Sequence, residues 1–233
     1  MKAHHITVFS AEGRLQGKDG ELFTVLAGQT LLGAKKLVLA SGSSAAVPPI
    51  PGVKEGLASG FVMTNRELLS MTRTPKELVC IGGGVIGLEM ACYFATIGVK
   101  VTVIEMLPKI AGNTDPEICE LLMKTYKKEG MQFCLNARVE SVQDGCVTYS
   151  DAAGQHRVSC DCVLLSAGRR ADVSGLNIEA LGLLTERGAL VTDEHLQTNV
   201  PGVYAVGDVR TKALRQIVTA VADGAVAVHM AEE

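Results

Sequence analysis

The chain has 233 residues, of which 47% are hydrophobic, and its formal net charge is −3. This length suits one large or two small domains, and the hydrophobic content excludes an intrinsically disordered chain. The small negative charge gives no electrostatic reason to expect nucleic acid or a membrane surface as a partner.

The cysteines and the chain's first residues indicate little special chemistry. There is no secretory leader and no run of membrane-spanning length, so a cytoplasmic protein is expected. The seven cysteines form neither C-x-x-C nor C-x-x-x-x-C. Cys160 and Cys162 alternate on a strand-like run, so both side chains are expected to point the same way. A metal or redox role for the pair is the lesser alternative, because no other ligand cluster accompanies it, and no metal site is assigned.

Residues 1–45 are interpreted as a β-meander followed by a buried strand. The strand-like runs are 6–9, 22–26, 29–32 and the apolar run 36–40, which ends at a small-residue turn. A meander without a helix does not begin a doubly wound domain, so this segment is interpreted as the later part of one.

A stiff, proline-rich connector at 47–52 marks a domain boundary, and residues 46–170 are predicted as a second domain. Within it, a short helix begins at 63–69 with Thr64 or Asn65 as its cap.

A strand, a glycine turn and a helix start follow one another at 76–89. The glycines at 82, 84 and 87 fit G-x-G-x-x-G after the apolar run 76–81. The first glycine allows the tight turn, the second lets a pyrophosphate approach the backbone, and the third lets the helix pack on the strand. The free N–H groups of the helix start favour phosphate binding.

The next apolar run, 99–104, ends in Glu105, which lies 18 residues after Gly87 (105 − 87). A carboxylate there accepts hydrogen bonds from a ribose 2′-hydroxyl and repels a 2′-phosphate. No basic residue follows directly, so NAD is predicted rather than NADP. The alternative is a glycine-rich turn that binds nothing.

The remaining elements are a helix, a strand, three antiparallel strands and the C-terminal segment 171–233. A helix over 113–129 is expected to place Ile118, Leu121, Leu122 and Tyr126 on one face, and a strand follows at 131–135. Three antiparallel strands are expected at 138–142, 146–150 and 156–165, with turns at 144–145 and 153–154. Residues 171–233 contain a short strand that ends in Gly207-Asp208, then a helix over 216–230.

Six ordered motifs together resemble the flavin-dependent pyridine nucleotide–disulfide oxidoreductases, over nearly the whole chain. They are 37–43 (LVLASGS), 48–52 (PPIPG), 81–89 (IGGGVIGLE), 101–105 (VTVIE), 167–170 (AGRR) and 198–209 (TNVPGVYAVGDV). The resemblance implies an α/β fold: a Rossmann-like NAD(P)-binding domain, with a parallel sheet plus a three-stranded meander, inserted in a partial FAD-binding domain formed by 1–45 and 171–233.

The resemblance implies a role for residues around each cofactor. On the NAD side, the backbone of Gly82, Gly84, Val85, Ile86 and Gly87 would cradle the pyrophosphate and Glu105 would hold the adenosine ribose. Glu89 would lie near the nicotinamide ribose and amide, where a solvated helix charge is the alternative. Gly168 would let the nicotinamide end pass the backbone, with Arg169 nearby.

On the FAD side, the resemblance implies that Ala40 and Gly42 lie against the cofactor and that Asp208 accepts a hydrogen bond from the ribityl chain. For Asp208 a plain helix cap is the alternative. Gln216 and Ile217 would contact the flavin through backbone N–H groups, because the tail 214–220 (LRQIVTA) resembles thioredoxin reductases.

The sequence departs from the family by what it lacks. The family's first FAD strand with its own G-x-G-x-x-G, both kinds of redox-active cysteine pair and the C-terminal dimerisation domain are not found, and no histidine matches a catalytic motif. No catalytic residue is therefore assigned. A partner chain or a missing half of the FAD domain is expected, a homodimer is left open, and apolar surface is expected to be exposed at 1–45 and 198–233.

Three functions follow as hypotheses. The first is part of a flavoprotein that transfers hydride between NAD(H) and FAD and is similar to dihydrolipoamide dehydrogenases. The second is an NADH:acceptor reductase without a thiol substrate. The third is an NAD-binding module without turnover.

Overall fold

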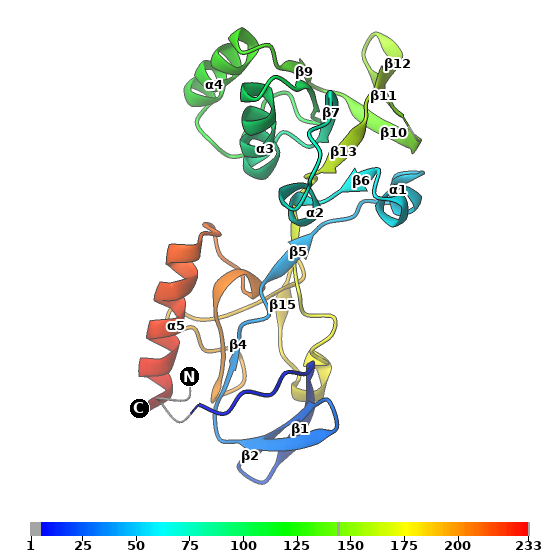
Figure 1. The fold of residues 1–233 in the computed structure, drawn as a ribbon. Helices are drawn as coiled ribbons and strands as arrows, with labels where there is room; N and C mark the ends of the chain where they lie inside the picture. The colour runs from blue at the N-terminus through cyan, green and yellow to red at the C-terminus, as the bar shows by residue number, and fades with distance from the viewer. Residues whose placement is uncertain (1–5, 144, 233) are drawn as a thin grey trace. The chain divides into compact units, whose positions relative to one another are not determined.

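The computed structural model describes residues 6–143 and 145–232, and the chain folds into two compact units (Figure 1). One unit comprises the residues up to Ser44 and from Arg170 onward, and is called unit 1. The other comprises Ala45–Arg169 and is called unit 2. The short strands β5 (Ser43–Ala45) and β14 (Arg169–Ala171), where the chain passes from one unit to the other, pair with each other.

Unit 2 is built on a five-stranded sheet in the order β6-β13-β7-β8-β9, and every neighbouring pair is parallel. Its strands are β6 (Val62–Met63), β7 (Glu77–Ile81), β8 (Lys100–Ile104), β9 (Gln132–Cys134) and β13 (Cys162–Leu165). Both faces of this sheet are buried, which explains the continuous apolar runs in its sequence. The parallel sheet expected from the sequence is confirmed.

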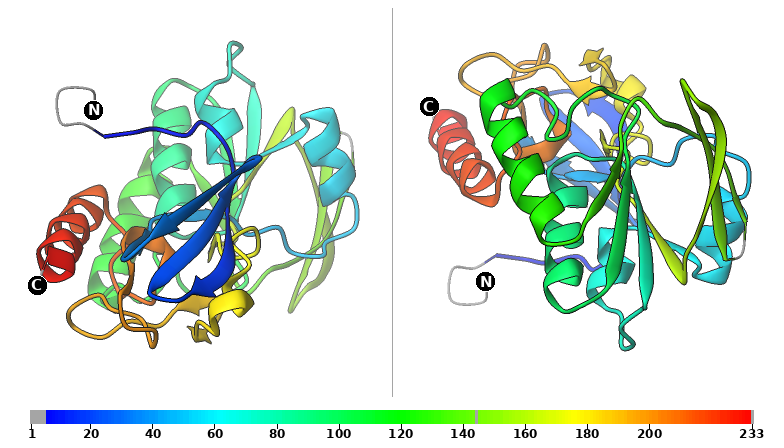
Figure 2. Two further views of the ribbon diagram at one scale, coloured as in Figure 1. Left: turned by 90° about the horizontal axis from the view of Figure 1, so that it is seen from below. Right: turned by 90° about the horizontal axis from the view of Figure 1, so that it is seen from above.

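Different elements pack on the two faces of the sheet. Val79, Ile81, Val163 and Leu165 pack toward the antiparallel meander, whereas the alternate residues of the same strands pack toward α3. The meander strands are β10 (Arg138–Gln143), β11 (Cys146–Asp151) and β12 (Gly154–Ser159), and the helices are α1 (Val53–Ser59), α2 (Asn65–Leu69), α3 (Val85–Thr96) and α4 (Pro116–Lys128). Figure 2 shows α3 and α4 on one side of the strands and the meander on the other.

The expected single strand 156–165 is wrong, because β12 ends at Ser159 and β13 begins at Cys162. Between them the chain leaves the meander and enters the parallel sheet. The Asp161 carboxylate accepts the backbone N–H groups of Lys76 and Glu77 at 2.6 and 3.0 Å, which fixes this crossing to the start of β7. Cys160 and Cys162 consequently lie in the cores on opposite faces, so the expectation that they point the same way is also wrong.

The two predicted helix starts are found, and the predicted face of α4 is right for Leu122 and Tyr126 but wrong for Ile118 and Leu121. Thr64 and Glu67 form a capping box at α2, and Asp115 caps α4 ahead of a proline in the first turn. On α4 the residues packed against the core are Cys119, Leu122, Met123 and Tyr126, whereas Ile118 and Leu121 are 49% and 62% exposed. The apolar residues of this helix exceed one face, so their spacing alone did not decide which side is buried. Asp144, of the turn expected at 144–145, lies outside the described residues.

Unit 1 contains an antiparallel meander, a parallel strand pair and one long helix. The meander is β1 (Gly13–Asp19), β2 (Leu22–Ala27) and β3 (Thr30–Ala34), the parallel pair is β4 (Leu37–Leu39) with β17 (Val203–Ala205), and α5 spans Ile217–Glu232. The smaller elements are β15 (Thr185–Glu186), β16 (Ala189–Leu190) and the 3-10 helices η2 (Ile178–Leu181) and η3 (Gly207–Val209). Residues 6–9 form no strand, and the first strand within the described residues is β1, whose polar, glycine-containing sequence carries a bulge between Leu15 and Gly17.

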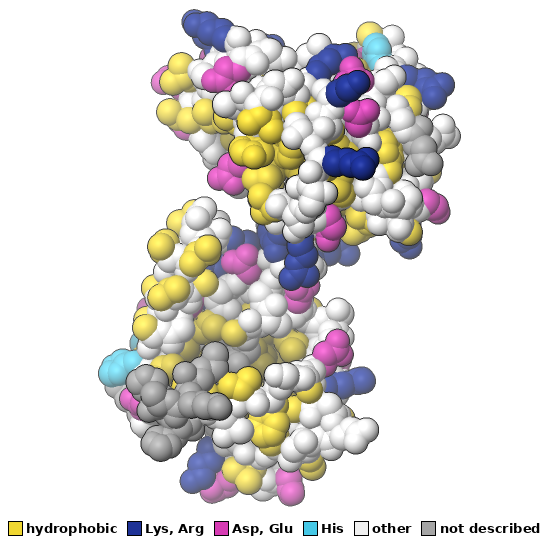
Figure 3. All heavy atoms as spheres, in the orientation of Figure 1, with side chains coloured by type: hydrophobic (Ala, Val, Ile, Leu, Met, Phe, Trp, Pro, Cys, Tyr) yellow, Lys and Arg dark blue, Asp and Glu magenta, His cyan; other side chains and the backbone are white. Residues whose placement is uncertain are grey.

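The apolar surface expected on unit 1 is present. Along α5, Ile217, Val218 and Val221 are between 68% and 83% exposed, whereas Asp223 and Ala227 are buried. Figure 3 shows hydrophobic side chains along this helix. The helix therefore turns its polar Asp223 inward and much of its apolar face outward.

Candidate functional site

The candidate nucleotide site of unit 2 begins at the turn between β7 and α3. Gly82 has φ +107°, and an added Cβ there would lie 2.5 Å from the carbonyl oxygen of Ser166. A Cβ at Gly87 would lie 2.2 Å from the carbonyl oxygen of Gly82. These two positions therefore require glycine for packing, whereas Gly84 faces open space with no atom within 4 Å of an added Cβ. The opening at Gly84 leaves room for a ligand to approach the backbone.

The first turn of α3 follows Gly84 and leaves its N–H groups available. Gly84 caps the helix without a side-chain hydrogen bond, and the first turn has no acidic residue. The N–H groups of Val85, Ile86 and Gly87 have no partner within an α-helix, since the first turn lacks preceding carbonyl groups. A helix start of this kind suits an anionic group.

Glu105, directly after β8, is tied to the glycine turn. One of its carboxylate oxygens accepts the backbone N–H of Gly83 at 2.6 Å, and the other accepts that of Leu107 at 2.8 Å. A carboxylate has about four lone-pair sites, so roughly two remain for ligand hydroxyl groups. Folding thus brings the carboxylate and the glycine turn together across 22 residues of sequence.

The third strand of the site is β13, whose end supplies Ser166 and Gly168. The Ser166 hydroxyl donates to the carbonyl oxygens of Ile81 at 3.1 Å and Gly82 at 2.9 Å, which stabilises the glycine turn. Gly168 has φ +114° and faces open space. The carboxyl ends of the neighbouring strands β13, β7 and β8 therefore meet at one edge, as at the ligand-binding edge of open parallel sheets. Glu89 lies exposed on α3, one turn further into the helix.

The second candidate site, in unit 1, lies at the ends of the parallel strands β4 and β17. The Ser43 hydroxyl donates to the Asp208 carboxylate at 2.9 Å, which joins residues that are 165 positions apart. Ala40 is exposed, and Gly42 has φ +73° with open space around it. Asp208, in η3, is thus paired with the first residue of β5 and has free acceptor sites.

The start of α5 belongs to the same unit. Gln216 and Ile217 are both exposed, and the Gln216 N–H has a long hydrogen bond of 3.3 Å to the Thr219 hydroxyl. That hydroxyl in turn donates to the carbonyl oxygens of Leu214 and Gln216. The backbone N–H of Gln216, which the sequence led us to expect as a flavin contact, therefore already has a weak hydrogen-bond partner in the protein.

Sequence reasoning missed Ser43, Ser166 and Asp223. Asp223 is buried on α5 and accepts hydrogen bonds from Gly207, Arg210 and Lys212. Burial by itself would raise the pKa of Asp223, but these hydrogen bonds outweigh it and hold the pKa well below its usual range. The signal was a single acidic residue within an otherwise apolar helix.

The buried thiols are poor nucleophiles. Burial raises the pKa of Cys160 to about 12 and that of Cys162 to about 11. Burial also raises the pKa of Cys80 far above the usual thiol range. Within residues 6–143 and 145–232, no group of three or more His, Cys, Asp or Glu side chains is placed to hold a metal ion.

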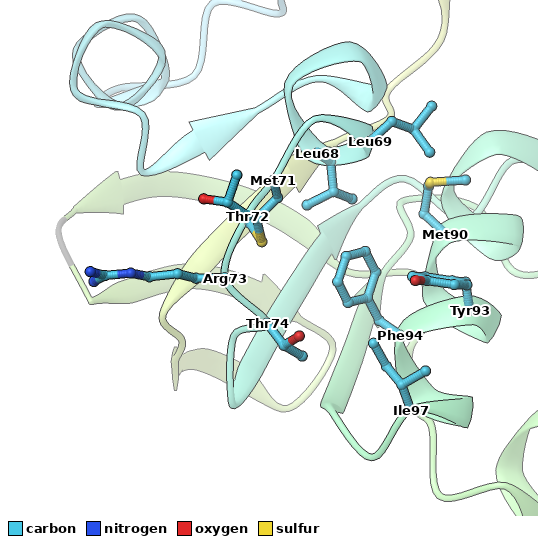
Figure 4. Close-up of a pocket in the computed structure, with 10 residues that line it drawn as sticks. All are labelled: Leu68, Leu69, Met71, Thr72, Arg73, Thr74, Met90, Tyr93, Phe94 and Ile97. Carbon is cyan, nitrogen blue, oxygen red and sulfur yellow. The ribbon is translucent and has the colours of Figure 1, made fainter.

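Unit 2 also has a small cavity of about 170 Å³ beside α2 and α3, away from the glycine turn (Figure 4). Its lining includes Leu68, Met90 and Phe94, while Arg73 points away from these side chains. None of the expected cofactor residues lines it. Across the described parts of the chain, no helix combines the length and apolar character needed to cross a membrane.

Comparison with known proteins gives one consistent result. The family described as "Pyridine nucleotide-disulphide oxidoreductase" matches residues 1–224. The chain is similar to the dihydrolipoyl dehydrogenase of Acholeplasma laidlawii, with 43% identity over 91% of this chain and 61% of the relative. It is 32% identical to the dihydrolipoyl dehydrogenase of Chlorobaculum tepidum, over 90% of this chain and 45% of the relative.

A solved structure agrees with these sequence matches. The thioredoxin reductase of T. acidophilum is similar in fold, with a TM-score of 0.80 and 27% identity over 94% of this chain and 72% of that one. The chain spans 61% and 45% of the lengths of the two curated relatives. The chain therefore belongs to the pyridine nucleotide-disulphide oxidoreductase family, a family of oxidoreductases.

Proposed function

We propose that unit 2 binds NAD(H) and that the chain is part of a dihydrolipoamide dehydrogenase-like flavoprotein in which hydride passes between NAD(H) and FAD. The observation that carries the proposal is the hydrogen bond between the Glu105 carboxylate and Gly83 N–H, beside the open face of Gly84. In this arrangement the pyrophosphate binds the backbone amides of the turn and of α3, and the adenosine ribose binds Glu105.

The region around Glu105 favours NAD over NADP. Met106 and Leu107, the next two residues, are apolar and exposed. Lys109 is the first cation after Glu105, and its ammonium group donates to the Thr114 carbonyl oxygen at 2.6 Å. Neither of the two residues that follow Glu105 is basic, so a 2′-phosphate would meet the Glu105 carboxylate without a cation from these positions.

Unit 1 supplies the FAD side of the proposal. Gly42 leaves its surroundings open, Asp208 offers acceptor sites next to Ser43, and α5 presents its positive end. These features fit part of an FAD site. FAD supplies the two-electron chemistry when it is bound, while the residues of this chain position the cofactors and stabilise charge. The rest of the FAD site belongs to a further segment or a partner chain.

The test is the affinity of the chain for NADH, measured by fluorescence titration. Glu105→Gln keeps the size of the side chain but removes its charge, so it is expected to weaken NADH binding about tenfold to a hundredfold. Because the NADP-disfavouring charge is also gone, the preference for NADH over NADPH is expected to narrow.

The matched control is Glu120→Gln, on the exposed side of α4 in the same unit. This variant has the same change in net charge and is expected to bind NADH like the unmodified chain. An unchanged NADH affinity of Glu105→Gln would remove the site assignment.

A further inference from the structure

The segment that follows β17 is fastened to α5 by one buried carboxylate. Asp223 accepts hydrogen bonds from the Gly207 N–H at 2.9 Å, from the Arg210 guanidinium at 3.0 and 2.9 Å, and from the Lys212 ammonium at 2.8 Å. All four donors come from residues 207–212, so the whole segment converges on one side chain.

The cluster is shielded from solvent. The side chains of Asp223, Arg210 and Lys212 are 11%, 17% and 7% exposed. A buried carboxylate is strongly unfavourable unless it is fully paired, and here it is paired by two cations and one backbone amide. If the charge of Asp223 were removed, Arg210 and Lys212 would lie close together in a buried site without a counter-charge. The segment would then lose its common anchor.

The anchored segment, residues 207–212, carries one of the residues expected on the FAD side, Asp208. Gly207, with φ +69°, donates directly to Asp223, and the next residue, Asp208, meets the hydroxyl of Ser43. An added Cβ at Gly207 would lie 3.4 Å from the Cβ of Ala220, so the turn packs closely on α5. Asp223 therefore binds the turn that carries Asp208, and it lies on the same helix as Ala220, which packs on Gly207 from the first turn of α5.

We infer that Asp223 is a positioning residue that holds the Gly207–Asp208 turn against α5, so that Asp208 and the first amides of α5 are presented together to the flavin. The flavin part of this inference rests on the proposed function. The holding of the turn by Asp223 stands on the contacts alone.

The test is amide hydrogen exchange of the whole chain, resolved for the turn by NMR. Asp223→Asn is expected to speed the exchange of the Gly207 and Asp208 amides about tenfold or more, because a hydrogen bond to a charged acceptor is lost. Asp223→Glu keeps the charge, and its amides are expected to exchange more slowly than those of the Asn variant.

Asn177→Ala is the matched control for stability. Asn177 donates to the Leu15 carbonyl oxygen at 2.7 Å and has φ +58°, so its replacement destabilises unit 1 away from the turn. Asn177→Ala is expected to lower the melting temperature. The exchange rates of the Gly207 and Asp208 amides, relative to those of neighbouring core amides, are expected to stay unchanged. Unchanged exchange in Asp223→Asn, or equal acceleration in Asn177→Ala, would overturn the inference.

Titration with FAD, followed by its visible absorption and fluorescence, separates the two proposals. If the unmodified chain binds FAD, Asp223→Asn is expected to weaken binding about tenfold, and Asn177→Ala to leave it within about twofold. If the unmodified chain binds no FAD, the proposed flavin function fails for this chain alone. The exchange rates of the turn then still decide whether Asp223 holds it.

Discussion

At the scale of single residues, the glycines of the nucleotide turn have different physical tasks. Gly82 and Gly87 are required by contacts inside the protein, whereas Gly84 borders open space. The pattern G-x-G-x-x-G predicted the tight turn at Gly82 and the close packing at Gly87, and the contacts of an added Cβ agree with both. The phosphate role of Gly84 stays a prediction.

Gly87→Ala tests the packing role. The added methyl group would lie 2.2 Å from the Gly82 carbonyl oxygen and 2.6 Å from the Ser166 hydroxyl, so the turn must shift. We expect a loss of about 1–3 kcal/mol in the free energy of unfolding, measured by denaturant titration, together with weaker NADH binding.

Gly224→Ala is the control for Gly87→Ala. Gly224 also lies within a helix, but nothing lies within 4 Å of an added Cβ. This substitution is expected to stabilise the chain by up to about 1 kcal/mol, because alanine favours helix. If both variants were equally stable, the close approach of α3 to the turn would not exist in solution.

The residues that sequence reasoning missed have distant partners. Ser43 meets Asp208 across 165 positions, and Ser166 meets Gly82 across 84. No periodicity or spacing connects such pairs, since they are created only when parallel strands align in the fold. The acidic residue Asp223 was visible in the sequence, but its partners at 207–212 were not.

Asp223 also predicts how stability depends on pH. Folding lowers the pKa of this carboxyl, so its ionised form stabilises the fold. That contribution is fully present above the unfolded pKa of about 3.9 and is lost as the pH falls through the lower pKa of the folded state. We expect the melting temperature of the chain to fall more steeply below about pH 4 than that of Asp223→Asn. Parallel curves for the two proteins would contradict the lowered pKa.

At the scale of elements, strands were easier to predict than the boundaries between them. The buried strands β7 and β8 read as continuous apolar runs, because both sheet faces are covered. The run 156–165 also looked like one strand, yet the chain changes sheet at Cys160–Asp161. Hydrogen bonds from the start of β7 to Asp161 decide this break, and they lie 84 and 85 residues away in sequence.

Helix α1 was missed and the buried side of α4 was misjudged for related reasons. Gly52 and Gly60 cap the two ends of α1 in left-handed conformations. Because a proline-rich segment comes directly before it, the sequence was interpreted as a connector and the short helix was not predicted. A Cβ at Gly52 would lie 1.7 Å from the Val142 carbonyl oxygen, so contact with the meander shapes this helix start. Tertiary packing, which a linear pattern does not contain, determined both elements.

Helix α5 gives a prediction of its own. Val221 is 68% exposed whereas Ala227 is fully buried, although both lie on the same apolar helix. Val221→Lys is expected to change the unfolding free energy by less than about 0.5 kcal/mol and to reduce self-association of the chain. Ala227→Lys is expected to unfold unit 1, because it buries a charge in the core.

Circular dichroism and light scattering measure these two effects. If Val221→Lys unfolded the chain, the outer face of α5 would be packed in solution. A monodisperse monomer of the unmodified chain would show that the exposed apolar residues do not drive association.

At the scale of the whole molecule, the chain runs from unit 1 into unit 2 and back into unit 1. Each candidate site lies within one of the two units. The chain divides at 44/45 and 169/170, and the sequence placed the second domain at 46–170, with the proline-rich connector as the sign of its first boundary. The nucleotide turn, Glu105 and Gly168 belong to unit 2, and Ser43, Asp208 and α5 belong to unit 1. Assignment of the units to NAD and FAD remains a proposal.

This division predicts a localised response to NADH. In amide hydrogen exchange, saturating NADH is expected to protect the segments 82–89 and 105–111 of unit 2, since a ligand stabilises the state that binds it. The turn at 207–208 and the start of α5 are expected to keep their exchange rates, because their hydrogen bonds lie wholly within unit 1. Glu105→Gln should abolish the protection in unit 2 at the same NADH concentration, while Asp208→Asn should retain it. Protection centred on unit 1 would reverse the assignment of the two sites, since it would place the nicotinamide nucleotide among the residues proposed for FAD.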